Sequence, residues 1–315
     1  MIPLLLQFII AVSGVWNAWD YNPGEWDELA PLLSEKGYDT VFYCAAYGPM
    51  VDREGLRECI ESCGEYGIDV HAWVVMWKTD VCPDSMVESF RRQERMQVSI
   101  QGDENPGTWL CPWNPENVEL MASICLDLAS EFPVKGIHLD YIRYPSNRNC
   151  FCSACREGFD PWRNVLWPDD CYYGGDFFRE YTAWRGDVIT SAVAAVRDSL
   201  SRINRVVELS AAVLPDNDSS GYFAQNWKDW LDRNLVDFVV AMNYTQSLGQ
   251  LDNWAGDQLP PGGSERILCG LITHREDYQL TAEELDEQKS KALRLGYGGT
   301  VVFHLSNYFV SLHRD

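Results

Sequence analysis

Basic residues are scarce in this chain of 315 residues. The sequence contains 25 lysines and arginines against 47 aspartates and glutamates, so its formal net charge is −22. A surface this acidic repels the phosphates of nucleic acids and the headgroups of anionic lipids. We therefore expect neither as a partner. The charge suits a neutral or cationic substrate, although a role in solubility explains it more simply.

No apolar run stands out as long enough to span a membrane. Residues 2–12 (IPLLLQFIIAV) are apolar, but a membrane-spanning helix needs about 20 such residues. The run resembles the core of a signal peptide with a cleavage site after Ser13, although no Lys or Arg precedes it. We expect residues 1–13 to be a signal peptide or, alternatively, an N-terminal cap of the fold. The first case predicts a secreted or periplasmic protein and the second a cytoplasmic one.

The sequence also lacks internal repeats and a glycine-rich phosphate-binding turn after its first strand. Instead, apolar strands alternate with amphipathic helices, several of which are followed by glycine, a common helix terminator. This order predicts an α/β fold with a parallel sheet, and eight strands close a (β/α)8 TIM barrel. We expect a single barrel domain over residues 14–315, with a stunted last helix and an insertion at about 145–176 after strand four. The expected strands are 15–20, 40–46, 69–77, 136–141, 206–214, 236–243, 266–272 and 299–305.

Active sites of such barrels lie at the C-terminal ends of the strands. Asp140 is the strongest candidate there, because a carboxylate among Ile137, Leu139 and Ile142 is costly to bury without a purpose. Arg143 follows three residues later and is predicted to contact the substrate. The alternative interpretation is a purely structural ion pair between Asp140 and Arg143.

Cleavage of a glycosidic bond needs two carboxyl groups. Asp216, directly after strand five, is the best second candidate, and Asp218 and Glu276 compete with it. For Asp216 and Asp218, a polar turn capped by its own Asx side chains is nearly as good an explanation.

Aromatic residues are abundant, with 13 Trp and 15 Tyr. Such rings pack against the C–H faces of sugars, although they also fill large cores. Side chains at the other strand ends are therefore predicted to bind substrate: Tyr47, Trp73, Trp77, Asn243 and Tyr244.

The 11 cysteines are odd in number, and three of them are clustered in NCFCSAC as Cys150, Cys152 and Cys155. Thiolates this close commonly bind zinc, which takes a fourth ligand. Cys111 is the preferred fourth ligand and Cys171 the second choice. Disulfides among Cys150, Cys152, Cys155 and Cys171 are the alternative, which export would favour.

The stretch GIHLDYIRYP at Gly136–Pro145 resembles the signature of the glycoside-hydrolase-like family 10 proteins, which are barrel-fold glycosidases. Weaker likeness extends over most of the chain, as in GVWNAWD, DVHAWVVMW and VDFVVAMNY. The resemblance implies that Asp140 is catalytic. It identifies no second catalytic residue.

The segment CFCSAC, together with the distant CPWNP, is similar to the zinc-binding cysteines of family 42 β-galactosidases. This likeness implies that Cys111, Cys150, Cys152 and Cys155 hold a structural zinc ion, and no organic cofactor is expected. The chain lacks a clear Asn-Glu pair at the end of strand four, so the glutamate mechanism of those enzymes is not transferred.

These observations predict a glycoside hydrolase that cleaves a poly- or oligosaccharide with two carboxylates centred on Asp140. The first alternative is a carbohydrate-binding barrel without activity. A metal-dependent hydrolase is a weaker alternative, because the strand ends lack the clusters of His and Asp that catalytic metals need. The sequence predicts neither the sugar nor the oligomeric state.

Overall fold

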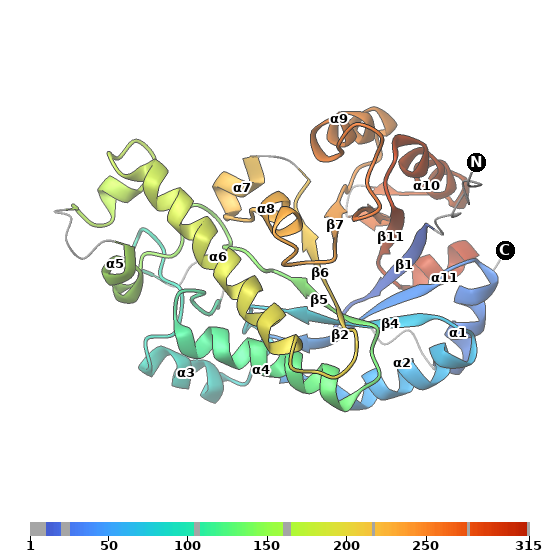
Figure 1. Ribbon diagram of the computed structural model, residues 1–315, viewed down its shortest axis with the longest axis horizontal. Coiled ribbons are helices and arrows are strands. Elements are labelled where there is room, and N and C mark those ends of the chain that lie inside the picture. Colours follow the sequence, from blue (N-terminus) through green and yellow to red (C-terminus); the bar gives the residue numbers. More distant parts are fainter. Residues whose placement is uncertain are drawn as a thin grey trace, which may run out of the picture.

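Eight parallel strands close into a barrel in the computed structural model, which describes residues 11–19, 26–103, 108–159, 165–215, 218–275 and 278–313 (Figure 1). Each strand pairs with the next along the chain, and the last pairs with the first, as the sequence predicts. The barrel strands are β1 (Val12–Asn17), β2 (Thr40–Tyr47), β4 (Asp69–Val75), β5 (Gly136–Asp140), β6 (Glu208–Val213), β7 (Phe238–Met242), β8 (Ile267–Ile272) and β11 (Gly299–Phe303).

Helices surround the strands, as the alternating pattern predicts. Local sequence explains these ends. The side chain of Asp52 caps α2, and Thr281 forms a capping box with Glu284 at the start of α10. Gly296 ends α10 in the left-handed region, at φ +100°. The main helices are α1 (Trp26–Glu35), α2 (Arg53–Glu65), α4 (Pro115–Glu131), α6 (Phe178–Leu200), α8 (Trp227–Asp232) and α10 (Ala282–Leu295).

The last helix, α11 (Asn307–His313), is short, as expected. The loops hold further short elements that the apolar pattern does not reveal, because most of them are too short to show a period. These are β3 (Met50–Val51), α3 (Asp84–Arg92), α5 (Ser153–Phe159), the 3-10 helix η1 (Asp169–Cys171), α7 (Asp218–Phe223), α9 (Leu248–Gln258), β9 (His274–Arg275) and β10 (Tyr278–Gln279). The insertion with α5, together with the start of α6, projects to one side of the barrel (Figure 1).

Strand β1 begins at Val12, and Ser13 and Gly14 pair with β11. Residues 1–10 lie outside the described residues, so the signal peptide and the export that it implies remain predictions. Among the residues that the structure describes, no helix combines the length and the apolar character needed to cross a membrane.

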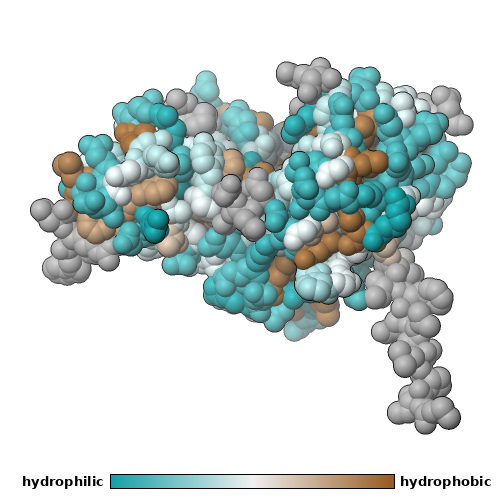
Figure 2. All heavy atoms as spheres, turned by 90° about the horizontal axis from the view of Figure 1, so that it is seen from above, coloured by the Kyte–Doolittle hydropathy of each residue, from teal (hydrophilic) through white to brown (hydrophobic). Residues whose placement is uncertain are grey.

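The core has two layers because neighbouring strand residues point to opposite faces. Trp16, Phe42 and Trp73 fill the inside of the barrel, while Val15, Val41 and Val74 pack against the helices outside it. Over the face shown in Figure 2, hydrophilic residues cover most of the surface and apolar residues form separate patches.

Candidate active site

A cavity of about 480 Å³ opens at the C-terminal ends of the strands. Seven of the eight barrel strands, or the loops that follow them, contribute to its wall. A larger groove of about 770 Å³ lies between α4 and α6 on the outside of the barrel, away from the strand ends. The position of the first cavity makes it the candidate site. Its lining includes Trp19, Tyr47, Trp73, Asp80, Asp140, Tyr141, Arg143, Met242, Tyr244, Ile272, Arg275 and Phe303.

Asp140 lies on the cavity wall, and its position follows from the two-residue alternation of β5. Ile137 and Leu139 pack into the outer core, whereas His138 binds the inward-facing indole of Trp16, whose Nε1 donates to His138 Nε2 at 3.2 Å. Asp140 continues the inward face, and only 7% of it is exposed. Burial raises the pKa of Asp140, while the charge of Arg143 opposes this shift.

The backbone after Asp140 turns in an unusual way. Tyr141 has a φ of +50°, a left-handed conformation that costs energy for a residue with a side chain. In this conformation the backbone N–H of Tyr141 donates to Asp140 Oδ1 at 2.6 Å. This hydrogen bond restrains the orientation of the carboxyl group at the cavity.

Arg143 lines the same cavity without an ion pair to Asp140, so the structural ion pair considered above is not formed between these two described residues. Its guanidinium lies among three rings, 4.8 Å from the centroid of Tyr141, 5.2 Å from Phe223 and 5.9 Å from Trp109. Its Nε is buried and has no hydrogen-bond partner. Burial lowers the pKa of Arg143, and the nearby charge of Asp140 raises it.

Tyr47 and Asp80 line the cavity beside Lys78. The Tyr47 hydroxyl donates to Asp80 Oδ2 at 3.1 Å, and Lys78 Nζ lies 3.1 Å from the same oxygen. The ammonium of Lys78 also lies 5.4 Å from the Tyr47 ring and 5.0 Å from the Tyr141 ring. The carboxylate of Asp80 is thus already neutralised by a neighbour.

The structure brings Trp73 and Tyr244, both predicted to bind substrate, to the cavity. Tyr244 stacks on Phe303 with ring centroids 5.7 Å apart. Their roles in binding remain predictions.

Two other predicted substrate contacts need correction. Trp77 is fully buried in the outer core, because β4 ends at Val75 and the alternation of faces stops there. Asn243 is also fully buried, and its Nδ2 donates to Tyr297 Oη at 3.0 Å and to Gln258 Oε1 at 3.2 Å. Neither residue lines the cavity.

Four further aromatic or cationic residues line the cavity although they were not predicted to bind substrate. Trp19, Tyr141, Arg275 and Phe303 also follow or end barrel strands, so position alone could have selected them. Their aromatic or cationic side chains, placed at strand ends, are the feature of the sequence that could have predicted them as cavity residues.

None of the three predicted second carboxyl groups is among the side chains that the structure describes. Asp216 and Glu276 lie outside the described residues, and the side chain of Asp218 does too, although α7 begins at that residue. Asp80 and Asp140 are the carboxylates of the described residues that line the cavity.

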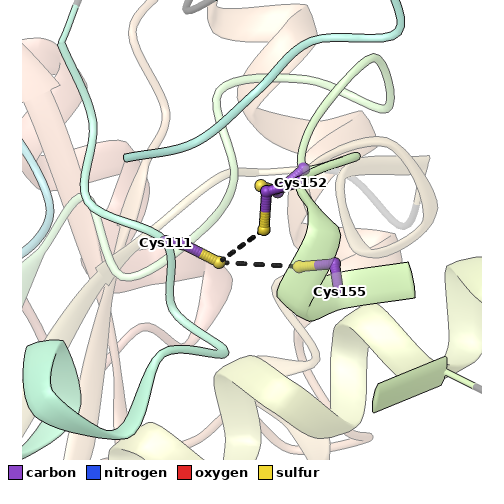
Figure 3. A group of neighbouring side chains, drawn as sticks. Cys111, Cys152 and Cys155 are labelled. Atoms are coloured by element: carbon purple, nitrogen blue, oxygen red, sulfur yellow. Dashed lines mark hydrogen bonds between the residues drawn. The ribbon is translucent and has the colours of Figure 1, made fainter. Parts of the chain in front are cut away.

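Four buried cysteines converge beside the barrel mouth. Cys111 follows β4, Cys150 and Cys152 follow β5, and Cys155 lies on α5, yet their sulfur atoms all lie within 4.8 Å of one another. Cys111 Sγ is 3.5 Å from Cys155 Sγ and 3.8 Å from Cys152 Sγ, and these sulfurs point toward one another (Figure 3). Cys171 lies elsewhere, packed with Phe151 and Tyr181. The preferred fourth ligand, Cys111, is therefore the one that joins the cluster.

The donor set fits a metal ion. A tetrahedral zinc site with Zn–S bonds of about 2.3 Å has sulfurs about 3.8 Å apart, close to the two separations found. None of the 11 cysteines, all of which the structure describes, forms a disulfide bond, so the disulfide alternative is not realised in this structure. Hydrogen bonds from the neighbouring thiols lower the pKa of Cys152, which favours a thiolate ligand there.

A buried arginine accompanies the cluster. Arg185 on α6 is 1% exposed, donates from Nη2 to Ser146 O at 2.6 Å and lies 4.4 Å from the ring of Tyr144. Burial lowers the pKa of Arg185, while two neighbouring tyrosines and the thiolates of Cys150 and Cys155 oppose this shift when they are ionised. Arg185 can thus offset the charge of a thiolate cluster.

Residues 48–275, well over half of the chain, match the family described as Glycosyl hydrolase-like 10. The chain belongs to this family. The match confirms the resemblance carried by GIHLDYIRYP. The search of curated proteins found no similar sequence.

Solved structures show which barrels this glycosyl hydrolase-like 10 chain is similar to. It matches the PgaB (BpsB) glycoside hydrolase domain from Bordetella bronchiseptica with a TM-score of 0.67 and 13% identity, covering 98% of this chain and 96% of that one. A β-galactosidase from Bacillus circulans sp. alkalophilus matches with a TM-score of 0.67 and 15% identity over 95% of this chain and 51% of that one.

A class V chitinase from Pseudomonas fluorescens Pf-5 matches with a TM-score of 0.58 and 12% identity, over 96% of this chain and 98% of that one. The chain spans about half the length of the β-galactosidase. At these identities the likeness supports the barrel fold alone.

Proposed function

We propose that this protein is a glycoside hydrolase that cleaves a poly- or oligosaccharide with a pair of carboxyl groups centred on Asp140. The observation that carries the proposal is the buried carboxyl of Asp140 on the wall of a cavity at the C-terminal ends of the strands. Membership of a glycosyl hydrolase-like family supports it. The glycosidases among the similar solved structures are consistent with it.

The environment of Asp140 suits a proton donor. A general acid must hold its proton near the working pH, and burial raises the pKa of Asp140 in that direction. Protonation of the glycosidic oxygen by Asp140 would release the leaving group. The hydrogen bond from the Tyr141 N–H to Oδ1 leaves Oδ2 as the oxygen to carry the proton.

The second carboxyl group would attack the sugar or activate a water molecule. Asp216, Asp218 and Glu276 remain the candidates for it, in that order. Asp80 is a poor candidate because Lys78 and Tyr47 already bind its carboxylate. A separation of about 5–5.5 Å from Asp140 would predict retention of configuration, and about 6.5–9.5 Å would predict inversion.

The aromatic side chains of the cavity would hold the sugar. Tyr47 on β2, Trp73 on β4 and Tyr244 just after β7 line it. Sugar rings present flat C–H faces that pack on such rings, and the polar groups between them bind hydroxyls.

We also propose that the four-cysteine cluster binds a structural zinc ion through Cys111, Cys150, Cys152 and Cys155. The ion would join the loop after β4 to the loop after β5 and to α5. The second of these loops leads away from Asp140, so its anchoring would stabilise the cavity wall.

The alternative is a sugar-binding barrel without catalysis. Cleavage needs two carboxyl groups. Of the two described carboxylates that line the cavity, Asp80 is paired with Lys78 and only Asp140 is not, which favours this alternative.

Release of reducing ends from a broad panel of oligosaccharides and polysaccharides, measured for the wild type and Asp140→Asn, separates the two functions. Hydrolysis that is lost in the variant supports the glycosidase. Saturable binding without any product, unchanged in Asp140→Asn, supports the binding protein instead.

A further inference from the structure

Two arginines line the cavity without an acidic partner among the described residues. Arg143 follows β5, and Arg275 lies on β9 just after β8. Within the described part of the chain, both guanidinium groups contact aromatic rings, and neither forms an ion pair. In a chain with 47 acidic residues and 25 lysines and arginines, arginines left unpaired at the candidate site call for an explanation.

Arg143 carries most of the argument because its side chain is half-buried and its Nε is buried completely. A buried charge is costly unless it is paired, and a guanidinium has five N–H donors. None of the donors of Arg143 binds an acceptor in the described structure, and its buried Nε has no partner. The three rings around it stabilise the cation but accept no strong hydrogen bond. The acceptors for these donors therefore come from water or from a ligand that enters the cavity.

The carboxylates of the cavity do not meet this need. Lys78 and Tyr47 bind Asp80, and Asp140 forms no ion pair with Arg143. Arg275 reaches the cavity from β9, next to β8, which is separated from β5 by β6 and β7 in the barrel. Its guanidinium lies 6.0 Å from the Tyr244 ring. The two cations therefore approach the cavity from different sides.

We infer that the substrate of this cavity is an acidic glycan, with a sugar carboxylate bound by Arg143 and with Arg275 adding a second positive charge. The planar fork of a guanidinium matches a carboxylate with two parallel hydrogen bonds. This inference rests on the proposed glycosidase function and names its substrate class. The sulfate group of a sulfated sugar is also an anion with oxygen atoms that accept hydrogen bonds from the guanidinium.

The net charge of −22 does not oppose this inference at close range. Salt screens charges at a protein surface beyond about 8 Å at physiological ionic strength. A direct contact inside a partly closed cavity is screened much less. The overall charge alone favoured a neutral or cationic substrate, whereas the cavity presents cations to the ligand.

The test measures binding of acidic oligosaccharides next to their neutral counterparts. Oligogalacturonates, oligoglucuronates and oligomannuronates are each compared with the carboxyl-reduced form of the same chain, and sulfated oligosaccharides form a separate set. Dissociation constants are measured on Asp140→Asn protein, so that hydrolysis does not consume the ligand. Arg143→Gln, Arg143→Lys and Arg275→Gln are then added to this background.

We expect at least one uronate chain to bind about tenfold or more tightly than its reduced form, as a charge-assisted hydrogen bond predicts. Arg143→Gln should remove most of that preference, and Arg143→Lys should keep part of it because the charge remains. Arg275→Gln should reduce it by a smaller factor, since that side chain is exposed. A preference confined to the sulfated set would assign the anion as sulfate instead of carboxylate.

Equal binding of acidic and reduced chains would overturn the inference, as would an unchanged preference in Arg143→Gln protein with native circular dichroism. The proposed function fails in a different experiment. If the wild type hydrolyses only neutral glycans and Asp140→Asn abolishes this, the glycosidase stands and the acidic substrate is wrong. If Asp140→Asn leaves hydrolysis unchanged, the reacting centre itself is wrong.

Discussion

Replacement of Asp140 by asparagine should abolish hydrolysis with little disturbance of the fold. Asparagine has nearly the shape of aspartate, and its amide oxygen can still accept the Tyr141 N–H that binds Oδ1 at 2.6 Å. The strained backbone at Tyr141 therefore keeps its local partner. What is lost is the exchangeable proton of a carboxyl group.

The size of the effect follows from the role of the group. A positioned general acid contributes about 10²- to 10⁴-fold in rate, which corresponds to about 2.7 to 5.4 kcal/mol at 1.36 kcal/mol per tenfold. The assay is release of reducing ends from the best substrate of the panel, at substrate concentrations above and below KM. We expect kcat to fall by at least 100-fold.

Asp69→Asn is the matched control. Asp69 begins β4 at the opposite end of the barrel, is exposed and lies 3.3 Å from Lys135. Its loss should leave kcat unchanged. Turnover in Asp140→Asn that equals the wild type, on a confirmed substrate, would refute the assignment of the reacting centre.

The same variant tests the raised pKa of Asp140. Because the folded pKa lies above the unfolded value of about 3.9, the folded state binds this proton more tightly, and ionisation costs stability as the pH rises. Asparagine avoids that cost. Asp140→Asn should therefore melt above the wild type at pH 7 and level with it at pH 3. Equal melting temperatures at both pH values would contradict the burial argument.

Three further predictions concern the cysteine cluster and the barrel core. Cys111→Ser should lower the zinc content and the melting temperature, whereas Cys171→Ser, also buried but outside the cluster, should retain zinc by elemental analysis. Arg185→Met should weaken zinc binding about 10- to 100-fold in chelator competition, and Arg185→Lys, which keeps the charge, should weaken it less; unchanged affinity would exclude a charge-balancing role. Burial lowers the pKa of His71 to about 3. Between about pH 6.5 and pH 3 the unfolded chain therefore binds a proton at His71 that the folded chain does not bind, and the free energy of unfolding should fall as the pH drops through this range. Urea unfolding should show a loss of roughly 3 kcal/mol between pH 7 and pH 4 from this group, absent in His71→Gln.

The barrel could be predicted from the sequence because its signals are local. Strands buried on both faces read as apolar runs, and glycines such as Gly296 end the helices between them. Asp140 could also be recognised, because a carboxylate inside such a run needs a special reason. The three close thiols of NCFCSAC needed no tertiary information to suggest a metal.

Side-chain direction and long-range pairing depended on the tertiary structure. Trp77 and Asn243 occupy strand ends in the sequence, but the end of β4 and the alternation after β7 turn them into the core. Cys111 was the preferred of two candidates, and only the folded chain brings its sulfur to within 3.5 Å of Cys155 across 44 positions of sequence. The absence of an ion pair between Asp140 and Arg143 likewise could not be read from their spacing of three residues.

The sequence by itself thus determined the order of strands and helices, the position of Asp140 at a strand end and the close spacing of three thiols in one loop. Only the tertiary structure decided which strand-end side chains share the cavity, which fourth thiol completes the cluster and which charges remain unpaired. The physical reason is that burial and backbone periodicity act between neighbours along the chain, whereas a cavity is formed by residues from seven strand ends whose directions depend on the closure of the barrel.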